Sequence, residues 1–242
     1  MTRTIRLGLL TPSSNTVLEP LSTAMVAGLP GVTLHFSRFR VTEIALNDAA
    51  LAQFDPAPVR HAAALLADAR VDAIAWSGTS ASWLGFDRDA ALCRQIEDAT
   101  GIPATSSVLA LNEALARTGV RRLGLLTPYR DDVQAQILAN YAELGIACVA
   151  ERHLRLQDNF SFAAVTEAQL ERMAHEVADA APQAIAVVCT NLRAAPLAPR
   201  LEAALGCPVY DSVATALWKA LRLAGGDPTQ VAGWGSLFAL AA

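Results

Sequence analysis

Short apolar runs alternate with longer amphipathic segments along the chain, and this alternation predicts a parallel α/β fold. The apolar runs, which we interpret as strands, lie at 5–10, 32–36, 73–76, 102–104, 122–126, 146–150, 184–188 and 208–210. Helical periodicity fills the intervals, most plainly at 58–69, 87–100, 106–117, 166–180 and 212–223. Strands that alternate with helices at this spacing form parallel sheets that are covered by helices.

The same succession of elements occurs twice, and short matching segments mark the repeat. The six residues LGLLTP occur at 7–12 and again at 123–128. A repeat of more than a hundred residues indicates two similar lobes rather than a solenoid. We therefore expect a pseudo-two-fold duplication, with an N-terminal α/β lobe over 1–118 and a C-terminal α/β lobe over 119–242. The last helix of the second lobe is free to pack back on the first.

A second matching pair aligns the polar residues that follow two buried strands. Ala-Ile-Ala opens the strands at 73 and at 184, and this alignment sets Gly78 against Cys189 and Thr79 against Thr190. Ligands of parallel sheets bind beyond the carboxyl ends of the strands. Polar or small residues gather at those ends in both lobes, namely Asn15, Gly78, Thr79, Ser80, Tyr129, Asn159, Cys189 and Thr190. We expect these residues to line one active-site cleft between the lobes.

Cys189 is the candidate catalytic residue, because the apolar run 184–188 stops abruptly at this thiol. Backbone N–H groups at the turn that follows are expected to lower the thiol pKa and to form an oxyanion site. A buried cysteine can also be a plain core residue, and we assign that role to the other three cysteines. Asn15 likewise has two interpretations, a helix N-cap or a ligand-binding amide.

Composition narrows the classes of partner. The chain has 242 residues, 53% of them hydrophobic, and a formal charge of −4 without a basic cluster, which argues against nucleic acid and against an anionic membrane surface. No leader segment or membrane span is evident, and we expect a cytoplasmic protein. The four cysteines and four histidines lack metal-ligand spacing, and the single lysine excludes a phosphate loop. We predict no metal and no cofactor, and a small molecule as the partner.

These motifs resemble the aspartate/glutamate racemase superfamily, and within it the branch of maleate isomerase and arylmalonate decarboxylase. Residues 12–16, Asn159 and Tyr129 are similar to the isomerase pattern, in which two asparagines and a tyrosine hold substrate carboxylates. Residues 78–82, Tyr129 and the single Cys189 resemble the decarboxylase, whose dioxyanion pocket uses a Thr-Ser pair, a tyrosine hydroxyl and the backbone around the cysteine.

The chain departs from the racemases and isomerases at Gly78, where those enzymes have a second cysteine. The resemblance therefore implies a cofactor-independent lyase that decarboxylates an aryl- or alkenyl-malonate, with enantioselective protonation by Cys189. Asn15, Gly78, Thr79, Ser80, Tyr129, Asn159 and Thr190 would bind the carboxylic acid substrate. A maleate cis-trans isomerase or racemase-like enzyme is the alternative, and a non-catalytic protein that binds a small acid is the second. The exact substrate, the product configuration and any homo-oligomer stay open.

Overall fold

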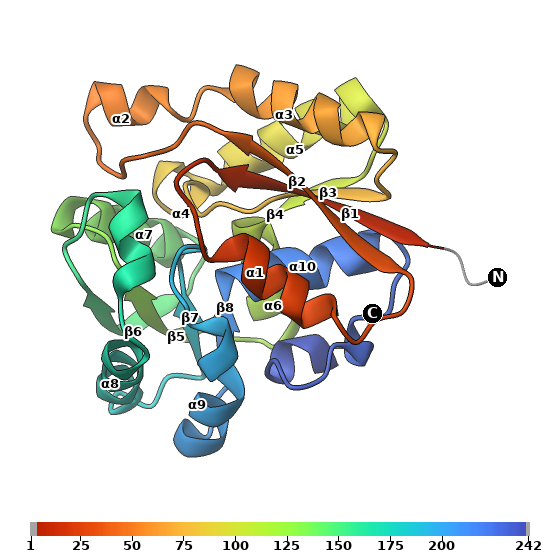
Figure 1. Cartoon of the computed structure of the whole chain (residues 1–242). Helices are drawn as coiled ribbons and strands as arrows, with labels where there is room; N and C mark the ends of the chain where they lie inside the picture. Colours follow the sequence, from red (N-terminus) through yellow and green to blue (C-terminus); the bar gives the residue numbers. More distant parts are fainter. Residues whose placement is uncertain (1–3, 241–242) are drawn as a thin grey trace.

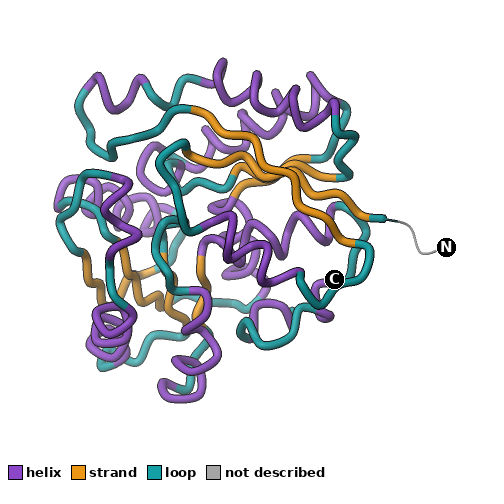
Figure 2. Tube along the Cα trace, in the orientation of Figure 1, coloured by secondary structure: helices purple, strands orange, loops and turns teal. Residues whose placement is uncertain are grey.

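The computed structural model describes residues 4–240, which form two parallel sheets flanked by helices (Figures 1 and 2). The first sheet has the order β2-β1-β3-β4 and consists of β1 (Ile5–Pro12), β2 (Val32–Phe39), β3 (Ala73–Trp76) and β4 (Ala104–Ser106). The second has the order β6-β5-β7-β8 and consists of β5 (Arg122–Thr127), β6 (Ala147–His153), β7 (Ala184–Val187) and β8 (Val209–Asp211). The two orders are equivalent, and the predicted fold class is confirmed.

The register of the strands repeats as well. Leu7 of β1 pairs with Ala73 of β3, and the equivalent Leu123 of β5 pairs with Ala184 of β7. The repeated glycine of the LGLLTP segment has a packing reason in the second copy. A Cβ atom on Gly124 would overlap the Val177 side chain of the covering helix. The repeat thus preserves a close approach of helix to sheet.

The longer helices lie where the periodicity predicts them. They are α1 (Leu18–Val26), α3 (Pro56–Asp68), α5 (Phe86–Thr100), α6 (Ser107–Arg117), α7 (Asp131–Glu143), α8 (Glu167–Ala178), α9 (Ala198–Leu205) and α10 (Ser212–Leu223). Sequence periodicity missed α2 (Asp48–Ala52) and α4 (Ala81–Leu84), which are too short to show a helical repeat. Short 3₁₀ turns complete the chain: η1 (Asn159–Ala164), η2 (Ala195–Leu197), η3 (Pro228–Gln230) and η4 (Ser236–Ala239). Between Thr4 and Leu240, no helix is long and apolar enough to cross a bilayer.

Helices α6 and α10, which are equivalent in the two copies, pack against each other where the lobes meet. The Thr215 hydroxyl of α10 donates to the Ser107 carbonyl of α6 over 2.9 Å. Glu113 of α6 forms ion pairs with Lys219 at 2.6 Å and with Arg222 at 2.5 Å. Helix α10 also contacts β3 and β4, so it lies under the first sheet in Figure 1. This packing brings the carboxyl ends of β3 and β7 toward a common space.

Candidate active site

Seven of the eight residues predicted for the site line one cavity between the lobes. They are Gly78, Thr79, Ser80, Tyr129, Asn159, Cys189 and Thr190. Apolar side chains, among them Val41, Ile44 and Trp83, form the rest of the wall. The cavity measures about 20 Å³, which is room for about one water molecule. The eighth residue, Asn15, lies behind Thr190 and donates to its hydroxyl over 3.1 Å.

Cys189 lies just beyond β7, separated from it by Val188, and is only 2% exposed. Burial raises the pKa of its thiol to about 12, although the Asn191 N–H group, 3.4 Å from Sγ, acts to lower it. The expectation of a lowered thiol pKa is therefore wrong. The chain after Cys189 is a loop as far as η2, so the N–H groups that follow the thiol belong to a turn rather than to a helix N-terminus. Burial therefore favours the neutral thiol form of Cys189.

Tyr129 and Thr79 join the two lobes at the site. The Tyr129 and Thr79 hydroxyl oxygens lie 2.7 Å apart in a buried hydrogen bond. Burial raises the pKa of Tyr129 well above its usual value, and the adjacent Cys189 raises it further. The rings of Trp83 and Phe162 pack against the tyrosine ring at centroid distances of 5.0 and 5.8 Å. Tyr129 thus keeps its proton and is held in place to donate it in a hydrogen bond.

Asn15 makes the contacts of a helix cap, and its amide nitrogen is bonded within the protein to Thr190. Its side-chain oxygen accepts hydrogen bonds of 2.9 Å from the backbone N–H groups of Val17 and Leu18, at the start of α1. Its amide nitrogen donates to Thr190, whose hydroxyl donates in turn to the Ser77 carbonyl over 3.1 Å. Asn15 therefore caps the helix and orients a residue of the cavity wall in the other lobe.

Asn191 was not predicted, yet it positions several residues of the site. Its amide nitrogen donates to the Asn159 carbonyl over 2.6 Å, and its amide oxygen accepts from the Thr16 N–H group over 3.0 Å. The Asn159 side chain donates to the Ser14 hydroxyl over 2.7 Å. The small polar turn after Cys189 was the available signal. Through these hydrogen bonds, Asn191 connects the loop after β1 to the turn that carries Asn159.

A clasp of two loops, residues 42–44 and 157–159, covers the cavity. The Ile44 N–H group donates to the Gln157 carbonyl and the Asn159 N–H group donates to the Thr42 carbonyl, each over 3.0 Å. The Gln157 side chain also bonds to Glu43. Each loop belongs to a different lobe, so the clasp closes the cleft. A ligand larger than water fits only when lining side chains or this clasp move.

Glycine is needed at residue 78 because of a steric contact rather than because of its backbone conformation. Its φ is outside the positive range found at the turn glycines, but a Cβ atom would overlap the indole ring of Trp76. The Trp76 ring therefore fills the space that a side chain at residue 78 would occupy. Sequence inspection could not find this contact, since it depends on how the ring is turned.

Two buried carboxyl groups near the site were also missed. Asp211 ends β8, and its Oδ1 accepts from the Val213 and Ala214 N–H groups at the start of α10. Burial raises the pKa of Asp211 to about 7, and its carboxylate contributes to the raised pKa of Cys189. Burial also raises the pKa of Asp89 on α5 to about 7. These two carboxyl groups are therefore expected to gain or lose a proton near pH 7.

The remaining cysteines are free thiols, as expected. Cys93 is buried, whereas Cys148 and Cys207 are partly exposed rather than fully in the core. Burial raises the pKa of Cys148 to about 12. Within residues 4–240, no three His, Cys, Asp or Glu side chains are grouped to hold a metal ion.

Comparison with known proteins places the chain among enzymes. The family model described as arylmalonate decarboxylase matches residues 13–238. Arylmalonate decarboxylase of Bordetella bronchiseptica is 35% identical over 66% of this chain and 68% of that protein. Maleate isomerase of Pseudomonas putida is 29% identical over 92% of this chain and 94% of that protein.

Solved structures agree with this relationship. A double mutant of arylmalonate decarboxylase in its liganded form has a TM-score of 0.84 at 28% identity, over 97% of this chain and 99% of that one. A maleate isomerase from Pseudomonas putida has a TM-score of 0.91 at 24% identity, over 99% and 100% of the two chains, and shows the shared fold. The predicted resemblance is confirmed, and the chain belongs to the arylmalonate decarboxylase family, in a branch of enzymes that it shares with the maleate isomerases.

Proposed function

We propose that the protein is a cofactor-independent decarboxylase of an aryl- or alkenyl-malonate, in which Cys189 protonates one face of the intermediate. One observation carries the proposal. Cys189 is the only thiol among the described residues that line the cavity, and the equivalent position in the first lobe is Gly78 under the Trp76 ring. A site with one acid protonates from one side.

Hydroxyl groups hold the carboxylate that the product retains. Thr79, Ser80 and Tyr129 line the cavity, and all three can donate hydrogen bonds. The second carboxylate faces the apolar wall of Val41 and Ile44, where an ionised carboxylate is poorly solvated. Loss of carbon dioxide relieves this contact, because the breaking C–C bond leaves its electron pair on the α-carbon as an enediolate. The hydroxyl donors stabilise the negative charge that develops on the retained carboxylate.

Proton transfer completes the reaction. The S–H bond of Cys189 breaks, the proton adds to the α-carbon, and the resulting thiolate regains a proton from water. A thiol with a pKa raised to about 12 by burial stays protonated at neutral pH, as a general acid must. The enediolate carbon is a strong base, so a weak acid can protonate it.

Maleate isomerisation is the second candidate. The maleate isomerases among the relatives match about nine tenths of this chain, and Asn15 and Asn159 are similar to the isomerase pattern. A structure of the Nocardia farcinica isomerase contains a succinylcysteine intermediate, which forms by addition of a thiol to the substrate. Thiol addition requires a thiolate. The raised pKa of Cys189 disfavours that chemistry in this chain.

A side-by-side assay separates the candidates. Purified protein is incubated with phenylmalonate and, separately, with maleate, and proton NMR follows phenylacetate and fumarate. We expect phenylacetate with release of carbon dioxide and little fumarate. Cys189→Ala should reduce the rate by roughly 10²-fold, the usual contribution of a general acid. Fumarate formation without decarboxylation would show that the isomerase assignment is the correct one.

The neutral thiol predicts a flat pH profile at alkaline pH. Burial raises the Cys189 pKa to about 12, so its acid form persists below that pH and kcat/KM should change little between pH 8.5 and 10.5, above the titration of Asp89 and Asp211. A thiolate mechanism instead requires kcat/KM to rise by about tenfold per pH unit in this range. Steady-state kinetics decide between them, and circular dichroism at each pH checks that the protein stays folded.

The Tyr129 hydroxyl is expected to act mainly on developing charge. Tyr129→Phe should therefore lower kcat by roughly 10²-fold and raise KM much less, since the loss of one such donor weakens stabilisation of the transition state more than binding of the substrate. Tyr141→Phe is the matched control, because the Tyr141 hydroxyl is buried without a hydrogen-bond partner. Its kinetics should equal those of wild type. An effect of Tyr129→Phe on KM alone would make this tyrosine a ground-state binder.

The Trp76 ring explains why a second thiol needs two substitutions. In the wild-type background, Gly78→Cys should lower the free energy of unfolding by about 1–3 kcal/mol through overpacking. In the Trp76→Ala background, where the ring is absent, the same substitution should cost much less. The folded double variant should then racemise single-enantiomer 2-phenylpropionate with deuterium uptake in D₂O. Thermal unfolding and chiral chromatography are the measurements, with Trp76→Ala as the control. Deuterium uptake no faster than in the control would mean that residue 78 does not face the α-carbon.

A further inference from the structure

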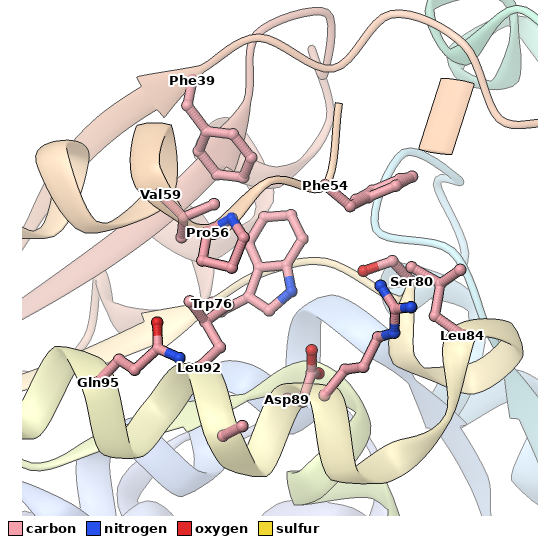
Figure 3. Close-up of a pocket in the computed structure, with 12 residues that line it drawn as sticks. Phe39, Phe54, Pro56, Val59, Trp76, Ser80, Leu84, Asp89, Leu92 and Gln95 are labelled. Atoms are coloured by element: carbon pink, nitrogen blue, oxygen red, sulfur yellow. The ribbon is translucent and has the colours of Figure 1, made fainter. Parts of the chain in front are cut away.

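A second cavity, between α3 and α5, adjoins the active site (Figure 3). It measures about 180 Å³ and is lined mostly by apolar side chains, including Phe39, Val59, Leu84 and Leu92. A dry apolar cavity of about 150 Å³ is large enough to bind benzene. This second cavity, called the outer pocket below, can therefore hold an aromatic ring.

The outer pocket and the catalytic cavity have a common wall. Phe54, Trp76 and Ser80 line both of them. The edge of the Trp76 ring covers Gly78 on the catalytic side, and Figure 3 shows the same ring at the centre of the outer pocket. Ser80 also belongs to the proposed carboxylate grip. A substituent that extends from the grip reaches the outer pocket only when these shared side chains move aside.

Four polar residues, Ser80, Arg88, Asp89 and Gln95, interrupt the apolar lining, and Asp89 is the one carboxyl group among them. Asp89 of α5 is 3% exposed, and its carboxyl group points up from α5 toward the Trp76 ring (Figure 3). Ser106 and the Trp76 indole act to lower the pKa of Asp89, but its Oδ2 atom has no hydrogen-bond partner. A buried carboxyl oxygen without a donor is unfavourable. A ligand that brings a hydrogen-bond donor removes this penalty.

We propose that the outer pocket binds the aryl or alkenyl substituent of the substrate and that Asp89 accepts a hydrogen bond from a hydroxyl or amino group on that substituent. The assignment rests on the proposed function. It makes Asp89 a specificity-determining residue that lies outside the cavity where the reaction occurs. The favoured substrate is then a malonate with a hydroxyaryl or aminoaryl group rather than a plain aryl group.

A binding experiment without turnover tests the pocket itself. Protein labelled with ¹⁵N-tryptophan is titrated with phenol and with anisole, which has the same ring but no donor, and the Trp76 indole signal is assigned by its loss in Trp76→Phe. Phenol should shift this signal and bind about tenfold more tightly than anisole, as expected for one hydrogen bond to a buried carboxyl group. Equal affinities, or no shift at Trp76, would overturn the proposal.

Substitution of Asp89 should change the preference. Asp89→Asn replaces one carboxyl oxygen by an NH₂ group, which donates hydrogen bonds instead of accepting them. The preference for phenol over anisole should then disappear. Asp98→Asn, an exposed site on the same helix, should behave as wild type.

Ala91→Phe fills the outer pocket without altering Asp89 and should abolish phenol binding, which tests the site even if Asp89→Asn does not fold.

Kinetics test the link to the substrate. The ratio of kcat/KM for (4-hydroxyphenyl)malonate to that for phenylmalonate should exceed one in wild type and fall by about tenfold in Asp89→Asn. Phenol binding with an unchanged ratio would contradict the role of the pocket as a substrate subsite. If no malonate is decarboxylated while phenol still binds at Trp76, the proposed function fails but the binding site stands.

Discussion

The packing of α6 against α10 is the contact on which the rest of the structure depends. These helices are equivalent in the duplicated lobes, and their hydrogen bond and ion pairs join the lobes near the ends of β4 and β8. Because the sheets repeat the same strand order, this junction brings the ends of β3 and β7 to one cavity. Thr79 from one lobe then meets Tyr129 from the other. Neither lobe holds the site alone.

Burial at this junction determines the chemistry of the site. The thiol of Cys189 and the hydroxyl of Tyr129 are almost fully enclosed, and burial raises the pKa of both groups. Two neutral donors in a small cavity suit proton delivery and the binding of a developing anion. A nucleophilic thiolate needs surroundings that lower the pKa of the thiol. The raised pKa of Cys189 supports the proposed protonation by this thiol rather than covalent addition.

The sequence predicts the fold well and groups residues that share one cavity, because a repeated strand order and the small polar residues after strands are both local patterns. The Ala-Ile-Ala repeat aligned Gly78 with Cys189, and the residues around them do line one cavity. Burial and ring orientation are not local. The direction of the Cys189 pKa was therefore wrong, and the Trp76 ring over Gly78 was missed. Asp89 and Asn191 were missed because their partners come from distant segments.

One-sided protonation by Cys189 is the central claim, and the enantiomeric composition of a chiral product tests it most directly. Methyl(phenyl)malonate is prochiral, and loss of either carboxylate gives the same planar enediolate, so decarboxylation in D₂O gives 2-phenylpropionate whose configuration records the face that received the deuteron. Because Cys189 is the only thiol among the described residues that line the cavity, the product should be largely one enantiomer with a single deuterium at the α-carbon. A racemic product, formed by an enzyme that does not racemise added 2-phenylpropionate, would contradict protonation from the Cys189 side.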